Sequence, residues 1–153
     1  DLQIKAAVDL GGLLIDGYGD GICISNENEN ITFTELKDLS FGILQASRMR
    51  MSKTDFVSCP GCGRTLFNLQ ETTLKIKQHF KHLDHLKIGI MGCVVNGPGE
   101  MGDVDYGFVG TSLNKVNLYK GLQPVKRHIP YENAVEELEQ LIRENGDWKD
   151  PVD

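Results

Sequence analysis

Three cysteines carry the strongest chemical signal in this 153-residue sequence. Cys59 and Cys62 are separated by two residues, and a turn between them brings both sulfurs to one side, where they can share a metal centre. Cys93 follows a second apolar segment further along the chain. If the segments before Cys59 and Cys93 are neighbouring strands, all three sulfurs meet at one edge of a sheet. The residue types and their spacing therefore indicate a thiolate-ligated metal centre.

A glutamate lies beyond a Gly-Pro-Gly bend that follows the third cysteine. Residues 97–99 can fold Glu100 back toward Cys93. Three cysteines leave one iron of a [4Fe–4S] cubane without a thiolate, and a carboxylate is a harder and more easily exchanged donor. Such a site holds three irons firmly and leaves the fourth open to a substrate. That arrangement suits Lewis-acid and electron-transfer chemistry.

Two other sites fit a Cys-x-x-Cys motif. A dithiol redox pair at the start of a helix is one, but it gives Cys93 no role. A zinc site is the other, and it would need a histidine such as His79, His82 or His85. Those residues lie at the far end of a predicted helix, where His79 is roughly 25 Å from Cys62 at about 1.5 Å per residue. We interpret them as solvated residues that complement the helix dipole. Spacing alone ranks iron–sulfur first, zinc second and dithiol third, and excludes none.

Composition narrows the class of protein. Hydrophobic residues make up 40% and charged residues 25%, which is ordinary globular usage. The net charge of −6 speaks against a nucleic-acid partner. No apolar run approaches the roughly 20 residues that cross a bilayer, and the sequence shows no secretory signal. Four cysteines in such a chain indicate a reducing compartment and metal or redox chemistry. Cys23, between two isoleucines, is expected to be a small buried hydrophobe.

From residue 54 onward the pattern predicts an α/β or α+β fold, in which helices cover a small mixed sheet. Strands are expected at 56–57, 88–91, 106–109, 116–119 and 124–129. A long helix is expected after Gly63, and another from Pro130 to a stop at residues 145–146. The first helix has an apolar stripe at intervals of three and four residues. Its members are Leu66, Leu69, Thr73, Ile76, Phe80 and Leu83.

The N-terminal third reads as part of another domain. Residues 1–10 predict a helix that ends at Gly11-Gly12, and residues 13–15 and 22–24 predict short strands. Thr34 is expected to cap a second helix. A polar joint at 48–53 marks the boundary, so we expect residues 1–50 to be the remnant of a preceding domain and 51–153 to bind the metal centre.

Three segments carry a resemblance to a known family. Residues 92–100 read Gly-Cys-Val-Val-Asn-Gly-Pro-Gly-Glu, residues 58–65 read Ser-Cys-Pro-Gly-Cys-Gly-Arg-Thr, and residues 13–20 read Leu-Leu-Ile-Asp-Gly-Tyr-Gly-Asp. With residues 125–127 and 148–151, they make the sequence closely similar to the C-terminal region of the 4-hydroxy-3-methylbut-2-en-1-yl diphosphate synthases, in the manner of the larger, plant-type members. The resemblance covers nearly the whole chain.

The resemblance implies a sulfite-reductase-like α/β domain whose [4Fe–4S] cluster is ligated by Cys59, Cys62, Cys93 and Glu100. It also implies that Asn96 approaches the substrate. The family reaction is a two-electron reductive ring opening and dehydration of 2-C-methyl-D-erythritol 2,4-cyclodiphosphate, which gives (E)-4-hydroxy-3-methylbut-2-enyl diphosphate for isoprenoid synthesis. Reduced ferredoxin or flavodoxin supplies the electrons, and the expected location is the bacterial cytoplasm rather than the plastid stroma.

The sequence departs from the family in one large respect. Family members have an N-terminal TIM barrel whose basic residues bind the diphosphate, and plant-type members insert a further domain. Neither is present here, so we expect residues 1–50 to be the end of the preceding barrel-like domain and the isolated chain to be inactive. The alternative of a different class is a zinc-stabilised structural or interaction module.

Overall fold

The computed structural model describes residues 1–25, 30–65, 67–95 and 97–151. The chain divides into two compact units, Asp1–Ser52 and Lys53–Asp153, and each is described by itself. Among the described residues, no helix is long and apolar enough to span a membrane.

The N-terminal unit begins with one continuous helical segment. It consists of α1 (Leu2–Ala6), a π-helical turn η1 (Ala7–Gly11) and α2 (Gly12–Ile15). The expected helix end at Gly11-Gly12 and the expected strand at 13–15 are therefore wrong. Gly12 keeps helical backbone angles, with φ −59° and ψ −47°. Continuing the helix buries Leu14 against Ala6 and Ile43, and this packing outweighs the weak helix propensity of two glycines.

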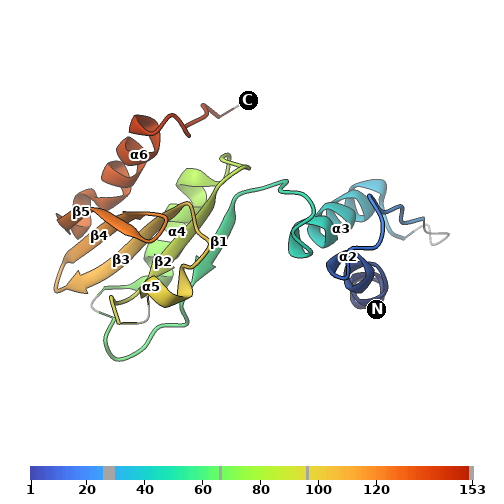
Figure 1. Cartoon of the computed structure of the whole chain (residues 1–153), viewed down its shortest axis with the longest axis horizontal. Helices are drawn as coiled ribbons and strands as arrows, with labels where there is room; N and C mark the ends of the chain where they lie inside the picture. Colours follow the sequence, from blue (N-terminus) through green and yellow to red (C-terminus); the bar gives the residue numbers. More distant parts are fainter. Residues whose placement is uncertain (26–29, 66, 96, 152–153) are drawn as a thin grey trace. The chain divides into compact units, whose positions relative to one another are not determined.

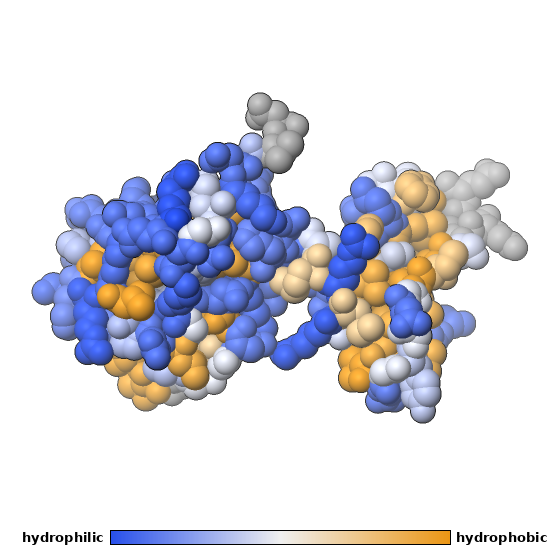
Figure 2. All heavy atoms as spheres, turned by 45° about the horizontal axis from the view of Figure 1, so that its top comes forward, coloured by the Kyte–Doolittle hydropathy of each residue, from blue (hydrophilic) through white to orange (hydrophobic). Residues whose placement is uncertain are grey.

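The second helix of this unit, α3, covers Phe33–Ala46. Its N-cap is Thr32 rather than the expected Thr34, because Thr32 forms a capping box with Glu35. Residues 22–24 belong to no strand, so the strand expected there is wrong. Several large apolar side chains of the unit are exposed, and Figure 2 shows them over much of its surface. They are Ile4, Val8, Leu13, Ile15, Tyr18, Phe33, Met49 and Met51.

The C-terminal unit contains a mixed five-stranded sheet, which confirms the expected fold class (Figure 1). The strands are β1 (Asp55–Ser58), β2 (Lys87–Met91), β3 (Tyr106–Ser112), β4 (Lys115–Lys120) and β5 (Gln123–Pro130). They lie in sequence order. β1, β2 and β3 are parallel, and β4 and β5 continue the sheet as antiparallel strands. All five strands match predicted segments.

Two longer helices pack on this sheet. α4 (Leu69–Phe80) begins later than expected, because the side chain of Asn68 caps it by accepting a hydrogen bond from the backbone N–H of Glu71. A 3-10 turn η2 (Tyr131–Asn133) leads into α6 (Ala134–Glu144). The remaining helix, α5 (Gly97–Glu100), is a single turn in the segment expected to be a loop.

Side chains alternate between the two faces of the sheet, as the pleat of a strand requires. One face, here called the helical face, is covered by α4 and α6 and holds the larger core, which includes Phe80, Tyr106 and Phe108. The other, here called the loop face, carries a smaller buried cluster beside α5 (Figure 1). That cluster consists of Met91, Met101, Val104, Val109 and Tyr119.

Candidate functional site

The cysteines of the C-terminal unit follow two neighbouring parallel strands. Ser58 of β1 lies opposite Ile90 of β2, so the carboxyl ends of these strands meet at one edge of the sheet. Cys59 directly follows β1, and Cys93 comes two residues after β2. The backbone N–H of Gly92 donates a hydrogen bond to the Cys59 sulfur at 3.2 Å. The condition under which the sulfurs can meet at one edge of the sheet, that these two strands are neighbours, therefore holds.

A tight loop holds the first two cysteines. Gly61, between them, has a φ of +84°, which a side chain would strain. The N–H of Cys62 donates to the Thr65 hydroxyl at 3.3 Å, and the N–H of Thr65 donates to the Cys62 carbonyl at 2.9 Å. The Thr65 side chain also packs directly against Gly92, where an added Cβ would overlap it. Thr65 therefore connects the Cys59–Cys62 loop to the end of β2.

Glu100 comes to the same place from α5. The N–H of Gly97 donates to the Cys93 carbonyl at 3.3 Å, so the helical turn starts from the third cysteine. Gly97 is buried and Glu100 is exposed. A cavity of about 70 Å³ opens between the three segments. Its lining residues are Cys59, Pro60, Gly61, Cys62, Met91, Cys93, Gly97 and Glu100.

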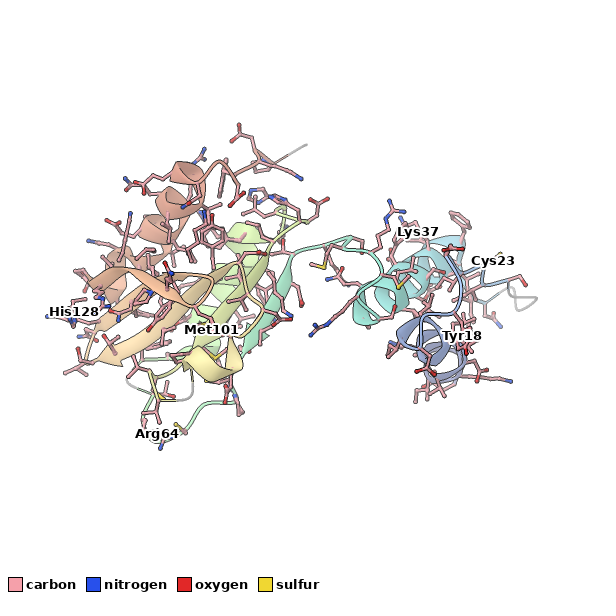
Figure 3. The ribbon with its side chains drawn as sticks, viewed as in Figure 1. Tyr18, Cys23, Lys37, Arg64, Met101 and His128 are labelled. Atoms are coloured by element: carbon pink, nitrogen blue, oxygen red, sulfur yellow. The ribbon has the colours of Figure 1, made fainter. Side chains whose placement is uncertain are left out.

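Arg64 supplies positive charge at this cavity. Its guanidinium hydrogen-bonds Cys93 and lies near Cys62, and these contacts raise the pKa of Arg64 above its usual range. The residue is exposed on the loop after the Cys-x-x-Cys motif (Figure 3). A fixed cation here offsets the negative charge that thiolate ligands carry. The sequence analysis assigned Arg64 no role at the cysteines, although its position two residues after Cys62 is a usable signal.

The four donors surround a cavity and do not close on one point. In the described part of the chain, no group of three or more His, Cys, Asp or Glu side chains converges enough to hold a single metal ion. A zinc ion needs donors that all lie about 2.0–2.3 Å from one centre. A cubane has four irons at separate corners, and each takes its own protein ligand. Three thiols and a carboxylate around one cavity are a donor set of the size that a [4Fe–4S] cluster takes.

The histidines lie away from the cysteines in the fold and take part in other contacts. His79 Nε2 lies 2.6 Å from a carboxylate oxygen of Glu139 on α6. The His82 ring contacts Trp148, and its Nε2 is buried with no hydrogen-bond partner among the described residues. His85 hydrogen-bonds the carbonyl of Asp147. The interpretation of all three as solvated helix-end residues is therefore wrong for His82, because the C-terminal segment folds over it.

Two further expectations concern Cys23, which was expected to be buried, and Asn96, which was expected to approach the substrate. Cys23 belongs to the N-terminal unit and is exposed, so the expectation that it is buried is wrong (Figure 3). In this segment Ile22 and Ile24 face the apolar cluster, and alternation turns Cys23 to solvent. Asn96 lies outside the described residues, as does Leu66 of the apolar stripe.

Comparison with known proteins identifies the family. Residues 55–144 match the family model described as GcpE protein C-terminal domain. A relative from Parabacteroides distasonis, named 4-hydroxy-3-methylbut-2-en-1-yl diphosphate synthase (flavodoxin), is 56% identical over 96% of this chain and 24% of its own length. Relatives with the same name from Porphyromonas gingivalis and Chlorobaculum tepidum are 53% and 54% identical over 98% and 97% of the chain, and over 26% and 20% of their own lengths.

The chain thus spans about a quarter of the length of the curated relatives that it matches. The family match covers 90 of the 153 residues (55 through 144), which is more than half of the chain, and includes all three cysteines of the cavity and Glu100. This chain belongs to the GcpE protein C-terminal domain family.

Proposed function

We propose that this chain is the iron–sulfur part of a 4-hydroxy-3-methylbut-2-en-1-yl diphosphate synthase. The observation that carries the proposal is the cavity at the ends of β1 and β2, which is lined by three cysteines and one glutamate. Family membership supports an iron–sulfur cluster in that place. Cys59, Cys62 and Cys93 would hold three irons, and Glu100 would hold the fourth. When bound, the cluster supplies electrons and a Lewis-acidic iron.

The protein groups around the cavity have distinct parts in this proposal. The Gly92 N–H, which donates to the Cys59 sulfur, and the Arg64 guanidinium, which contacts Cys93, stabilise negative charge on the sulfurs. Glu100 is exposed on a single helical turn, so its carboxylate can leave its position without unfolding a core. Asn96 stands between Cys93 and that turn in the sequence, and we propose that it contacts the substrate, as the family resemblance implies.

The whole enzyme requires more than this chain. We propose that its substrate is 2-C-methyl-D-erythritol 2,4-cyclodiphosphate, opened reductively by two electrons with loss of water. The relatives are named for flavodoxin, which makes flavodoxin the proposed donor here, ahead of ferredoxin. Bacterial relatives favour the bacterial cytoplasm as the location. We also propose that residues 1–50 are the end of a preceding barrel-like domain and that 51–153 form the cluster domain.

The isolated chain is expected to be inactive even with its cluster. A diphosphate needs several fixed cations to be held against water. Arg64 contacts the cysteines of the cavity, whereas Lys87 and Lys126 are paired with carboxylates elsewhere in the unit. The net charge of −6 also repels a diphosphate at long range. Losing substrate orientation removes roughly 7–11 kcal/mol of barrier reduction, which takes turnover below detection.

Metal analysis of an anaerobic preparation tests the cluster. The proposal expects about four irons and four sulfides per chain, as a cubane requires. Stoichiometric zinc without iron would replace it with the zinc-stabilised module. A second assay adds the cyclodiphosphate and a reductant, with and without the separately expressed N-terminal part. Product only on mixing supports the divided site, and product from this chain alone contradicts it.

A further inference from the structure

We propose that Met101 is a positioning residue, whose side chain fills a notch between Gly89 and Gly107 and so fixes the adjacent Glu100 at the cavity. The proposal rests on the proposed function, because it assigns Glu100 a place as a cluster ligand. Sequence reasoning gave Met101 no role. Figure 3 shows it beside α5, on the loop face of the sheet.

The notch comes from the register of two parallel strands. Gly89 of β2 lies directly opposite Gly107 of β3. Both belong to the loop face, since their neighbours Ile88, Ile90 and Tyr106 pack in the core of the helical face. Two paired glycines leave a stretch of sheet surface without side chains. A neighbouring side chain can therefore approach the backbone more closely than it could if either position carried a residue other than glycine.

The Met101 side chain fills this space and packs directly against both glycines. An ideal Cβ added to Gly89 would lie 2.9 Å from both Cγ and Sδ of Met101, and one added to Gly107 would lie 2.7 Å from Sδ. Such distances are far below a normal carbon–sulfur contact, so a larger residue at either glycine would force the Met101 side chain to shift. Met101 is fully buried. An unbranched thioether suits an irregular slot of this kind.

The same side chain controls where α5 lies. A helix of four residues cannot hold itself together, because nucleation costs more than one turn of hydrogen bonds returns. At its start, buried Gly97 packs against Met91 and Val109. At its end, the N–H of Met101 donates to the Gly97 carbonyl at 3.1 Å, and the Met101 side chain is seated in the notch. Glu100 lies between these two anchors, and its direction follows from them.

A set of variants separates positioning from general core packing. Met101→Ala empties the notch, and Gly107→Ala blocks it. Met101→Leu keeps a side chain of similar volume and should therefore keep α5 in its wild-type position. Ile88→Ala is the matched control, because Ile88 is fully buried on the same strand as Gly89 but faces the helical side. In the Met101→Ala background, Gly107→Ala should cost much less than it does alone, because Sδ and Cε of Met101 are gone and only Tyr119 Cβ, at 3.2 Å, stays close to the added methyl group.

Hydrogen exchange on the metal-free chain gives a readout independent of the cluster. Met101→Ala should speed exchange at the amides of residues 101 and 104 by about tenfold or more relative to Ile88→Ala, because local opening becomes easier. Met101→Leu should leave those amides close to wild type. Equal acceleration by Met101→Ala and Ile88→Ala overturns the seating of α5 by the notch, whatever the metal analysis finds.

Iron spectroscopy on the reconstituted chain tests the link to Glu100. Met101→Ala should change the Mössbauer signature of one iron out of the four, so that it resembles the signature of that iron in Glu100→Ala. In a Glu100→Ala background, Met101→Ala should leave the Mössbauer signature unchanged. Ile88→Ala should leave the signature as in the wild type. If Met101→Ala keeps the wild-type signature while its local exchange rises, the positioning of Glu100 is refuted and the notch is only packing. If neither the wild-type chain nor any variant binds iron, the proposed function fails. The hydrogen-exchange result alone then decides whether Met101 holds α5 in the notch.

Discussion

The two faces of the five-stranded sheet are built from different kinds of side chain. Among the described residues, the core of the helical face contains fourteen buried hydrophobic residues, almost all branched or aromatic, whereas that of the loop face contains five, of which two are methionines. Two helices of eleven and twelve residues cover the first face, and one helical turn with its flanking loops lies on the second. Because apolar burial scales with stability, most of the folding free energy of this unit comes from the helical face.

The difference shows where this fold can place chemistry. On the loop face Gly89 and Gly107 let the Met101 side chain approach the backbone closely, and just beyond β2 the N–H of Gly92 donates to the Cys59 sulfur. The cysteines follow the strands at the edge of that face, and Glu100 lies on its single turn. A face with few packed side chains can change the position of one carboxylate at little cost. The helical face keeps the strands in register while that happens.

Removing a cysteine ligand should have the largest effect. Cys93→Ala is expected to reduce bound iron from about four per chain to well below one, since two thiolates and a carboxylate are left to hold a cubane. The free energy of unfolding of the metal-free chain should change by about 1 kcal/mol or less, as Cys93 is only half-buried. Iron analysis and urea unfolding measure the two effects.

Cys23→Ala is the control for this change, because it removes an exposed thiol of the N-terminal unit. It should leave the iron content unaltered. Retention of four irons by Cys93→Ala, or equal loss in both variants, would contradict the assignment of the cavity as the cluster site.

Closing the exchangeable position should come next in size. Glu100→Cys in the full-length enzyme is expected to keep about four irons but to lower turnover at least about tenfold, because a fourth thiolate does not give way to substrate. Glu132→Cys adds a thiol at an exposed position of η2 and should leave turnover unchanged. Normal turnover in the Glu100→Cys enzyme would sink the ligand-exchange role of this residue.

The helical face can be weakened separately from the site. Phe80→Ala removes a fully buried ring from its core and is expected to lower the free energy of unfolding by about 3–5 kcal/mol. Leu74→Ala, on the same helix but exposed, should cost about 0.5 kcal/mol or less. Urea unfolding with intact iron content in the surviving folded fraction is the measurement. A Phe80→Ala chain of wild-type stability would mean that the two faces do not differ as proposed.

Much of this contrast could be predicted from the sequence. Short apolar segments predicted all five strands. The parallel pairing of β1 with β2 meets the condition under which Cys59 and Cys93 reach one edge of the sheet. Local capping signals were less reliable. Asn68 caps α4 later than the Gly63 start, and the helix continues through Gly11-Gly12, because packing of Leu14 decides the backbone there.

The contacts that depend on register could not be predicted. Gly89 and Gly107 look like ordinary strand glycines until the pairing of β2 with β3 sets them opposite each other. The contact between Met101 and these glycines is visible only in three dimensions. The same holds for His82, which the C-terminal segment covers through Trp148. The ligand roles of the three cysteines and Glu100, and the substrate contact of Asn96, remain predictions.

The smallest expected effect concerns acid stability at the helical face. Glu139 on α6 accepts hydrogen bonds from Arg143 and from His79 of α4, and these hold its pKa below the usual value of 4.5. A carboxylate with a lowered folded-state pKa contributes stability above pH 4.5, and the contribution is lost as pH falls through the folded-state pKa.

Glu139→Gln should therefore lower the free energy of unfolding by about 0.5–1 kcal/mol at pH 7. The difference from wild type should shrink as pH falls through the lowered folded-state pKa of Glu139, because the side chains of both chains are then neutral at this position. Glu136→Gln, at an exposed position on the same helix, is the matched control and should change the free energy of unfolding by about 0.5 kcal/mol or less. Urea unfolding of the metal-free chains at pH 7 and at a pH below that folded-state pKa gives the difference directly. A Glu139→Gln deficit that is the same at both would mean that packing rather than the ion pair joins α4 to α6.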